Sequence, residues 1–123
     1  MPRTREITDI EVARNFFCIS YEDYDTGWKV TYEISERINE IQAIREHWVK
    51  LCKTQSYLIT FNGNHYDIPM MLYLMSLDPN DDYENILYKL YKFSKFIIET
   101  DFWWDADKMK KFKYPRGILS VDL

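Results

Sequence analysis

Residues Phe61-Asn62-Gly63-Asn64-His65-Tyr66-Asp67-Ile68-Pro69 join a short apolar run to an apolar helix, and the other elements can be placed around them. Residues 57–61 are aromatic and β-branched, as in a buried strand, whereas Pro69 and the apolar residues after it are typical of a first helical turn. Ligands of α/β sheets bind at such junctions, at the carboxyl ends of strands. The stretch therefore predicts either a ligand site or a plain capped helix, with Asp67 as N-cap and Gly63 in a tight turn.

A second acidic cluster, Asp9-Ile10-Glu11, lies near the start of the chain in an apolar β-type segment. Residues two apart on a strand point to the same face, so Asp9 and Glu11 should lie side by side. Carboxylates buried in such a segment would need a cation or a proton. Two-metal hydrolytic sites use paired oxygen ligands of this kind. We therefore expect a divalent-metal site at this pair.

The first half of the chain shows strand periodicity before helical periodicity. Strands are expected over residues 7–12, 15–22 and 28–34, with a turn at Asp25-Thr26-Gly27, so that these three form an antiparallel meander. A helix capped by Ser35 should follow and run to about Lys53.

That helix leads to the strand at residues 57–61. A strand-helix-strand connection normally returns the chain parallel, so this strand should lie beside the first one. The arrangement would bring Asp67 near Asp9 and Glu11.

After the turn signal at residues 78–82, an amphipathic helix is expected from Tyr83 to about Thr100, and a last strand over residues 118–123. Between them, residues 102–116 interleave aromatic and basic side chains with little periodicity. Such a segment suits a single-stranded nucleic acid, because aromatic faces stack on bases and lysines follow phosphates. Alternatively, it is a loop whose tryptophans pack back onto the sheet.

Composition limits the classes of function. The 123 residues can form one domain, 1–123, and the net charge of −4 argues against a general nucleic-acid coat but allows a local basic surface. No run approaches the ~20 apolar residues of a membrane span, and no signal peptide is evident, so a cytoplasmic protein without a membrane partner is expected. Cys18 and Cys52 should be buried thiols, and His47 an ordinary helix residue.

The two acidic motifs together resemble those of the DEDD (DnaQ-like) 3′-to-5′ exonucleases, a branch of the ribonuclease H fold. The resemblance rests on Asp9-Ile10-Glu11-Val12, then Asn15-Phe16-Phe17, and finally Phe61-Asn62-Gly63 with Tyr66-Asp67. The motif pattern is similar in particular to that of the exonuclease domain in exonuclease or polymerase proteins of bacteriophages. It implies an α/β fold with a ribonuclease H-like mixed sheet, in which antiparallel strands are followed by parallel strands, with flanking helices.

The resemblance also implies a site. Asp9, Glu11 and Asp67 would be the catalytic metal ligands for two Mg²⁺ or Mn²⁺ ions, and the substrate would be the 3′ end of single-stranded DNA. Nucleic-acid contacts would come from the second-motif loop and from the aromatic-basic segment, namely Asn62, Tyr66, Trp103, Trp104, Lys108, Lys110, Lys111, Lys113 and Arg116.

One part of the family pattern is missing: the third motif, a Tyr or His four residues before a last Asp on a downstream helix. Tyr21 and Asp25 have that spacing but fall between the first two motifs. We therefore expect the front part of the family domain, incomplete at its C-terminal side. Two functions remain open. The chain is a 3′-to-5′ exonuclease domain, completed by a polymerase or a second chain, or it is a truncated, inactive module that binds a nucleic acid or a protein.

Overall fold

The computed structural model describes residues 3–61, 66–100 and 119–122, with side chains for the first two ranges. The strands are β1 (Arg5–Ala13), β2 (Phe16–Asp23), β3 (Lys29–Ile34), β4 (Tyr57–Thr60) and β5 (Leu119–Asp122). The helices are α1 (Ile41–Thr54), α2 (Asp67–Ser76) and α3 (Tyr83–Thr100). Every helix and strand expected from the sequence is present, and α3 has the expected bounds.

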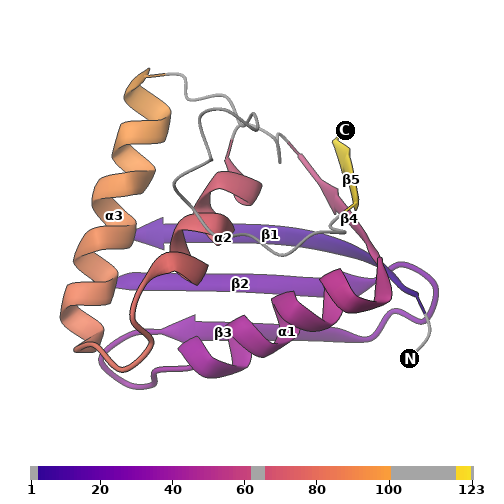
Figure 1. Ribbon diagram of the computed structural model, residues 1–123, viewed down its shortest axis with the longest axis horizontal. Helices are drawn as coiled ribbons and strands as arrows, with labels where there is room; N and C mark the ends of the chain where they lie inside the picture. The colour runs from indigo at the N-terminus through magenta and orange to yellow at the C-terminus, as the bar shows by residue number, and fades with distance from the viewer. Residues whose placement is uncertain (1–2, 62–65, 101–118, 123) are drawn as a thin grey trace.

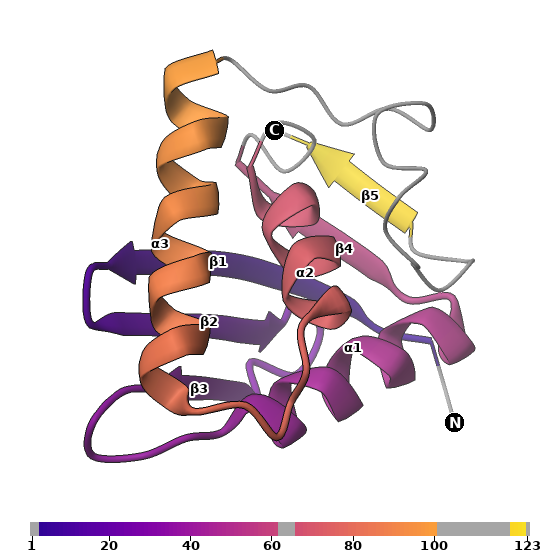
Figure 2. The ribbon, with the colours of Figure 1, turned by 60° about the vertical axis from the view of Figure 1, so that its left-hand side comes forward.

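The five strands form one mixed sheet in the order β3-β2-β1-β4-β5 (Figures 1 and 2). β1, β2 and β3 pair antiparallel, β4 lies parallel to β1, and β5 lies parallel to β4. The antiparallel meander is therefore confirmed, as is the parallel return of the chain beside the first strand. Gly27 closes the β2–β3 turn with a positive φ of 77°, which glycine adopts without strain.

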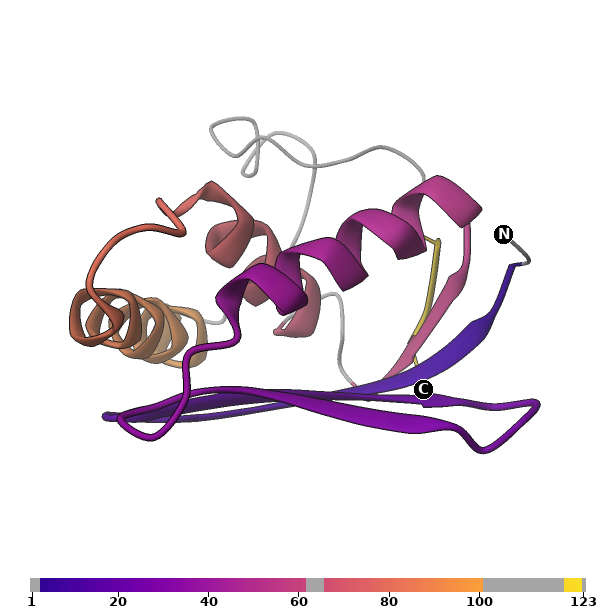
Figure 3. The ribbon, with the colours of Figure 1, turned by 90° about the horizontal axis from the view of Figure 1, so that it is seen from below.

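All three described helices cover the same face of the sheet, as Figure 3 shows. The strands alternate accordingly, since residues with buried side chains in β1 and β2 take every second position. The core between sheet and helices includes the fully buried Phe17, Ile19, Tyr21, Ile44, Trp48 and Leu58. Within the described part of the chain, no helix is both long and apolar enough to cross a membrane.

Helix α1 begins at Ile41, five residues later than a helix capped by Ser35 would, and its N-cap is Glu40. The intervening residues are bound to the end of β3 instead. Glu33 accepts hydrogen bonds from the Ser35 hydroxyl and, through both carboxylate oxygens, from the Arg37 guanidinium at 2.6 and 2.7 Å. These hydrogen bonds lower the pKa of Glu33 to about 2. The local side-chain bonds compete with the first helical turn and delay it.

A buried hydrogen bond joins β1 to α1. Glu6 Oε1 lies 2.7 Å from His47 Nε2, and both side chains are 5% exposed. The ring of Tyr21 stacks on His47, and the Tyr32 hydroxyl lies 3.2 Å from His47 Nδ1. His47 is a helix residue, as expected, and its imidazole lies on the buried stripe of α1 with Ile44 and Leu51.

This pair should make stability depend on acid pH. Burial alone would raise the pKa of Glu6, but hydrogen bonds from His47 and Thr4 outweigh it, and the pKa is lowered from 4.5. A depressed pKa contributes stability above the unfolded-state value, and that contribution is lost as the pH falls through the folded-state value. We expect Glu6→Gln to weaken the loss of stability below about pH 4.5, measured by urea unfolding from pH 7 to pH 3. The exposed Glu46→Gln is the control, and an equal effect there would contradict the assignment.

Candidate functional site

The register of β1 with β4 fixes where the first acidic motif lies along the strand direction, relative to the end of β4. Ile7 lies opposite Ile59 in the parallel pair, and β4 ends one residue later, at Thr60. Asp9 follows Ile7 by two residues, so it lies just beyond the carboxyl end of β4. This is the edge at which open α/β sheets bind ligands.

Asp9 and Glu11 point to the face of the sheet that no described helix covers. Both side chains are exposed, and they alternate with the buried residues Thr8 and Ile10. Their same-face placement is therefore confirmed, whereas the expectation that they are buried is wrong. The reason is that all described helices pack on the opposite face, which leaves this one in contact with water (Figure 3).

The neighbours of the pair on β2 are Ser20, opposite Asp9, and Cys18, opposite Glu11. Burial raises the pKa of the Cys18 thiol, and the carboxylates of Glu11 and Asp9 raise it further. The thiol is thus protonated at neutral pH, so it is a poor nucleophile and a poor ligand. Within the described residues, neither Asp9 nor Glu11 has an ion-pair partner.

Asp67 lies on the helix side of the sheet. It is the first residue of α2, is only 6% exposed, and adds to the raised pKa of the Tyr21 hydroxyl, which burial chiefly causes. A carboxylate in the first turn is stabilised by the helix dipole. The residue at the N-cap position is Tyr66, so the alternative in which Asp67 is the N-cap is wrong.

The structure therefore brings Asp9 and Glu11 together but does not gather all three expected ligands. Across residues 3–61 and 66–100, no three His, Cys, Asp or Glu side chains lie close enough to hold a metal ion. The donor chemistry of the exposed pair nevertheless suits a hard cation, because two carboxylates on adjacent same-face positions offer only oxygen ligands. The three-residue ligand set stays a prediction.

Tyr66 fixes the start of α2 against α3. Its half-buried ring ends in a hydroxyl that lies 2.7 Å from Ser94 Oγ, and the contact with Ser94 lowers the pKa of the phenol, although burial raises it more. The expected nucleic-acid role of Tyr66 thus competes with a structural one. Asn62 and the segment from Trp103 to Arg116 lie outside the described residues, so their expected contacts stay predictions.

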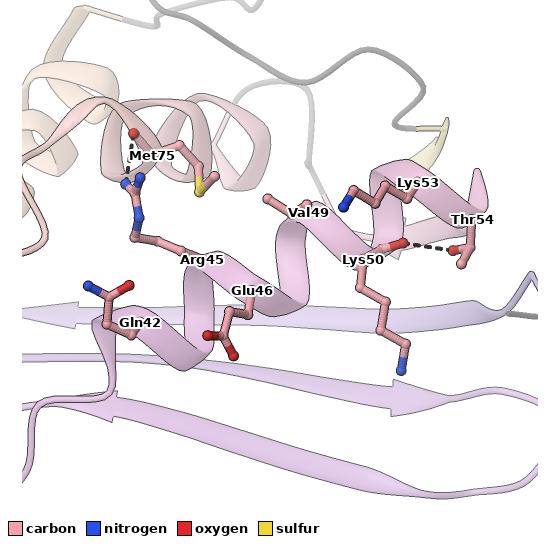
Figure 4. A pocket seen from close by; sticks show the side chains of 8 residues that line it. All are labelled: Gln42, Arg45, Glu46, Val49, Lys50, Lys53, Thr54 and Met75. Atoms are coloured by element: carbon pink, nitrogen blue, oxygen red, sulfur yellow. Dashed lines mark hydrogen bonds between the residues drawn. The ribbon is translucent and has the colours of Figure 1, made fainter.

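A groove of about 470 Å³ lies elsewhere, between α1 and the end of α2 (Figure 4). Arg45 reaches across it and donates a hydrogen bond of 2.9 Å to the carbonyl of Met75, while Lys50 points away from α2. None of the candidate site residues lines this groove. Arg45 thus satisfies the Met75 carbonyl, while the Ser76 hydroxyl donates to the Tyr73 carbonyl in the same last turn of α2.

The Tyr66–Ser94 contact can be tested by removing one hydroxyl at a time. We expect Tyr66→Phe and Ser94→Ala each to lower the free energy of unfolding by about 1 kcal/mol, and the double variant to cost less than the sum, because one hydrogen bond is shared. Urea unfolding measures all three. Tyr88→Phe removes an exposed hydroxyl and should change stability by less than about 0.5 kcal/mol. Additive losses at Tyr66 and Ser94 would contradict the assignment.

Comparison with known proteins agrees with this arrangement at the level of the fold. A family model described as the RNase_H superfamily matches residues 6–105, which include both acidic motifs, the parallel β1–β4 pair and all three helices. No curated protein and no solved structure matches the chain. Since the matched region covers most of the sequence and the mixed sheet has the order and directions described above, the chain belongs to the RNase_H superfamily.

Proposed function

We propose that this chain is a metal-dependent 3′-to-5′ exonuclease domain, or part of one, that hydrolyses 3′-terminal phosphodiesters of DNA. Membership of the RNase_H superfamily supports the coarser statement, a nuclease-type domain that uses divalent metals. The finer statement rests on the two acidic motifs, Asp9-Ile10-Glu11 and Tyr66-Asp67.

The observation that carries the proposal is the position of Asp9 and Glu11. Both carboxylates share one exposed face of β1, at the level where β4 ends, and neither has an ion pair in the described part of the chain. Two like charges held side by side repel each other and gain from a shared cation. The exposed Glu46 on α1 likewise has no ion pair among the described residues, so Asp9 and Glu11 are distinguished by lying together on one face of one strand.

In this proposal Asp9 and Glu11 hold Mg²⁺ or Mn²⁺ as hard oxygen ligands, and Asp67 approaches from the end of β4. Divalent ions in such a site supply an activated water and stabilise the leaving oxygen. The chain itself would hold the 3′ end of single-stranded DNA, with Asn62 shaping the loop before α2. A polymerase or a second chain that carries a Tyr or His base and a fourth carboxylate would complete the site, and a phage protein in the bacterial cytoplasm fits this role.

The position of Asp67 favours a second candidate, a catalytically inactive module that binds nucleic acid or a protein. Asp67 is buried on the helix side, whereas Asp9 and Glu11 face the opposite side of the sheet. If that separation persists in the presence of metal, the exposed pair alone can bind a cation only weakly. The two candidates differ in whether Asp67 contributes to metal affinity.

Thermal stability in the presence of metal tests the ligand set. A cation that binds only the folded protein stabilises it by mass action, by about 2.7 kcal/mol at a concentration of 100 times Kd. We expect Mn²⁺ to raise Tm of the wild type, Asp9→Asn to abolish the shift, and Asp67→Asn to reduce it. Scanning calorimetry with a Mn²⁺ titration measures the shift.

The matched control is Glu46→Gln, which neutralises an exposed carboxylate on α1. It should leave the Mn²⁺ shift unchanged. A shift that survives both Asp9→Asn and Glu11→Gln would place the metal elsewhere and remove the basis of the proposal. A shift that depends on Asp9 and Glu11 but not on Asp67 would favour the binding module.

Hydrolysis separates the two candidates directly. Loss of a general base typically costs about 10²- to 10⁴-fold in rate. We therefore expect this chain alone to digest a labelled oligodeoxynucleotide from its 3′ end feebly or not at all with Mn²⁺, and any activity to vanish in Asp9→Asn. Robust digestion that Asp67→Asn abolishes would show that the base lies within this chain, with His65 as the first residue to test.

A further inference from the structure

Helix α3 carries an exposed face on which aromatic and basic side chains alternate. Residues four apart on a helix lie on one line, and Tyr88, Lys92 and Phe96 have this spacing. Tyr88 is 60% exposed and Phe96 is 48% exposed. Lys89 and Lys95 lie on either side of the line, so the face spans just over two helical turns.

The charge of this face differs from that of the whole protein. Between Glu84 and Glu99 the helix contains three lysines and no acidic residue, whereas the chain has a net charge of −4. An ordinary solvated helix face mixes both signs, as α1 does with Glu46 between Arg45 and Lys50. The α3 face is therefore a local basic surface on an acidic protein.

The lysines are only partly engaged within the protein. Lys89 lies 3.5 Å from Asp81, and the ammonium of Lys95 lies 5.7 Å from the centre of the Tyr91 ring. Lys92 has no ion pair among the residues for which side chains are described. Two of the three cations are thus available to an anionic ligand without breaking an internal ion pair.

The two aromatic side chains of this face, Tyr88 and Phe96, expose much apolar surface to water. Burying Tyr88 or Phe96 would be favourable, yet both rings keep about half of their surface in water, and Phe96 does so while stacking on Phe93. Exposed rings between lysines match a single-stranded nucleic acid, whose unpaired bases have open faces for stacking and whose phosphates carry the opposite charge. Tyr88 shares a groove with Glu84 and Glu36, so the basic part of the face, where phosphates would lie, is the part around Lys92 and Lys95.

The buried side of α3, opposite this face, contacts the start of α2. Ser94, on the buried side of α3 between Lys92 and Phe96, forms the hydrogen bond to Tyr66 that holds the residue before Asp67. Figure 2 shows that the C-terminal end of α3 extends beyond β1, on the side of β1 where β4 lies.

We propose that the exposed face of α3, formed by Tyr88, Lys89, Lys92, Lys95 and Phe96, binds single-stranded nucleic acid. The proposal goes beyond the nuclease assignment, because binding to this face needs no metal. A base stacks on the Tyr88 ring, and the lysines contact phosphates along the helix. The chemistry is shared by DNA and RNA, because neither stacking nor phosphate contact reads the sugar.

Binding in EDTA tests this surface without the metal site. Fluorescence anisotropy of labelled oligothymidylate and oligouridylate, titrated with protein at several salt concentrations, gives both affinity and salt slope. Each lost phosphate contact lowers the slope by about 0.7 for a single strand. We expect Lys92→Gln with Lys95→Gln to lower the slope by about 1.4 and to weaken binding at least about tenfold. Tyr88→Ser should weaken binding roughly tenfold with little change in slope.

The matched control is Lys50→Gln with Lys53→Gln, which removes the same charge at the same spacing from α1 (Figure 4). It should leave affinity within about twofold of the wild type. No binding by the wild type, or an equal loss in the control, would overturn the proposal. So would a loss on Tyr88→Ser that is insensitive to salt and to the α3 lysines, which would indicate a protein-docking surface.

These results are independent of the metal test. If the α3 variants bind normally while Asp9→Asn still abolishes the Mn²⁺ shift, this proposal fails and the nuclease assignment stands. If binding depends on α3 but Mn²⁺ has no effect on Tm, the nuclease assignment fails and the nucleic-acid surface stands. Tighter binding of one of the two oligonucleotides would show that contacts beyond this face read the sugar.

Discussion

The parallel pairing of β1 with β4 is the constraint on which the other features depend. β4 has only four residues, so its register must be held from outside. The Thr4 carbonyl accepts a hydrogen bond of 2.9 Å from the Tyr57 amide, and the Thr4 amide donates one of 2.9 Å to Ser56 Oγ. These bonds anchor the first residues of both strands. A slip of one residue would exchange the two faces of β4 and expose Leu58, which is fully buried.

The same register gives β1 two kinds of carboxylate. Glu6 points toward the helices, where His47 and Thr4 complete its hydrogen bonds, while Asp9 and Glu11 point the other way into water. A charge on the helix side requires a partner because desolvation is costly, and His47 supplies it. On the open face, water solvates the side chains of Asp9 and Glu11, so neither needs a protein partner. Within the described residues neither has an ion pair, and both carboxylates are available to a cation.

Much of the fold could be predicted from the sequence because its signals are local. The alternation in residues 28–34, the stripe in residues 83–100 and the proline in the first turn of α2 each depend on neighbours along the chain. The delayed start of α1 could not be predicted so readily, because Ser35 is drawn into a hydrogen bond with Glu33. The sequence also contains signals for the Glu6–His47 pair. Glu6 lies four residues before Ile10 on β1, so both side chains point to the buried face, and His47 lies one helical turn from the buried Ile44.

The candidate site was predictable in its first half only. Spacing alone places Asp9 and Glu11 on one face, because two residues on one strand have a fixed relation. Asp67 belongs to another element, and its side depends on how α2 packs, which no local pattern encodes. The packing is set by contacts such as Tyr66 with Ser94, far apart in sequence.

Asp67 and the exposed pair therefore differ in how their charges are held. The first turn of α2 stabilises the carboxylate of Asp67 through the helix dipole even though little of it meets water. Asp9 and Glu11 depend on solvent and repel each other, so a dication relieves more strain between them than at Asp67. A cation would bind the pair first. Asp67 would join only if the gain in coordination exceeded the cost of removing it from the helix side, and that balance decides between a nuclease site and a surface that merely binds metal.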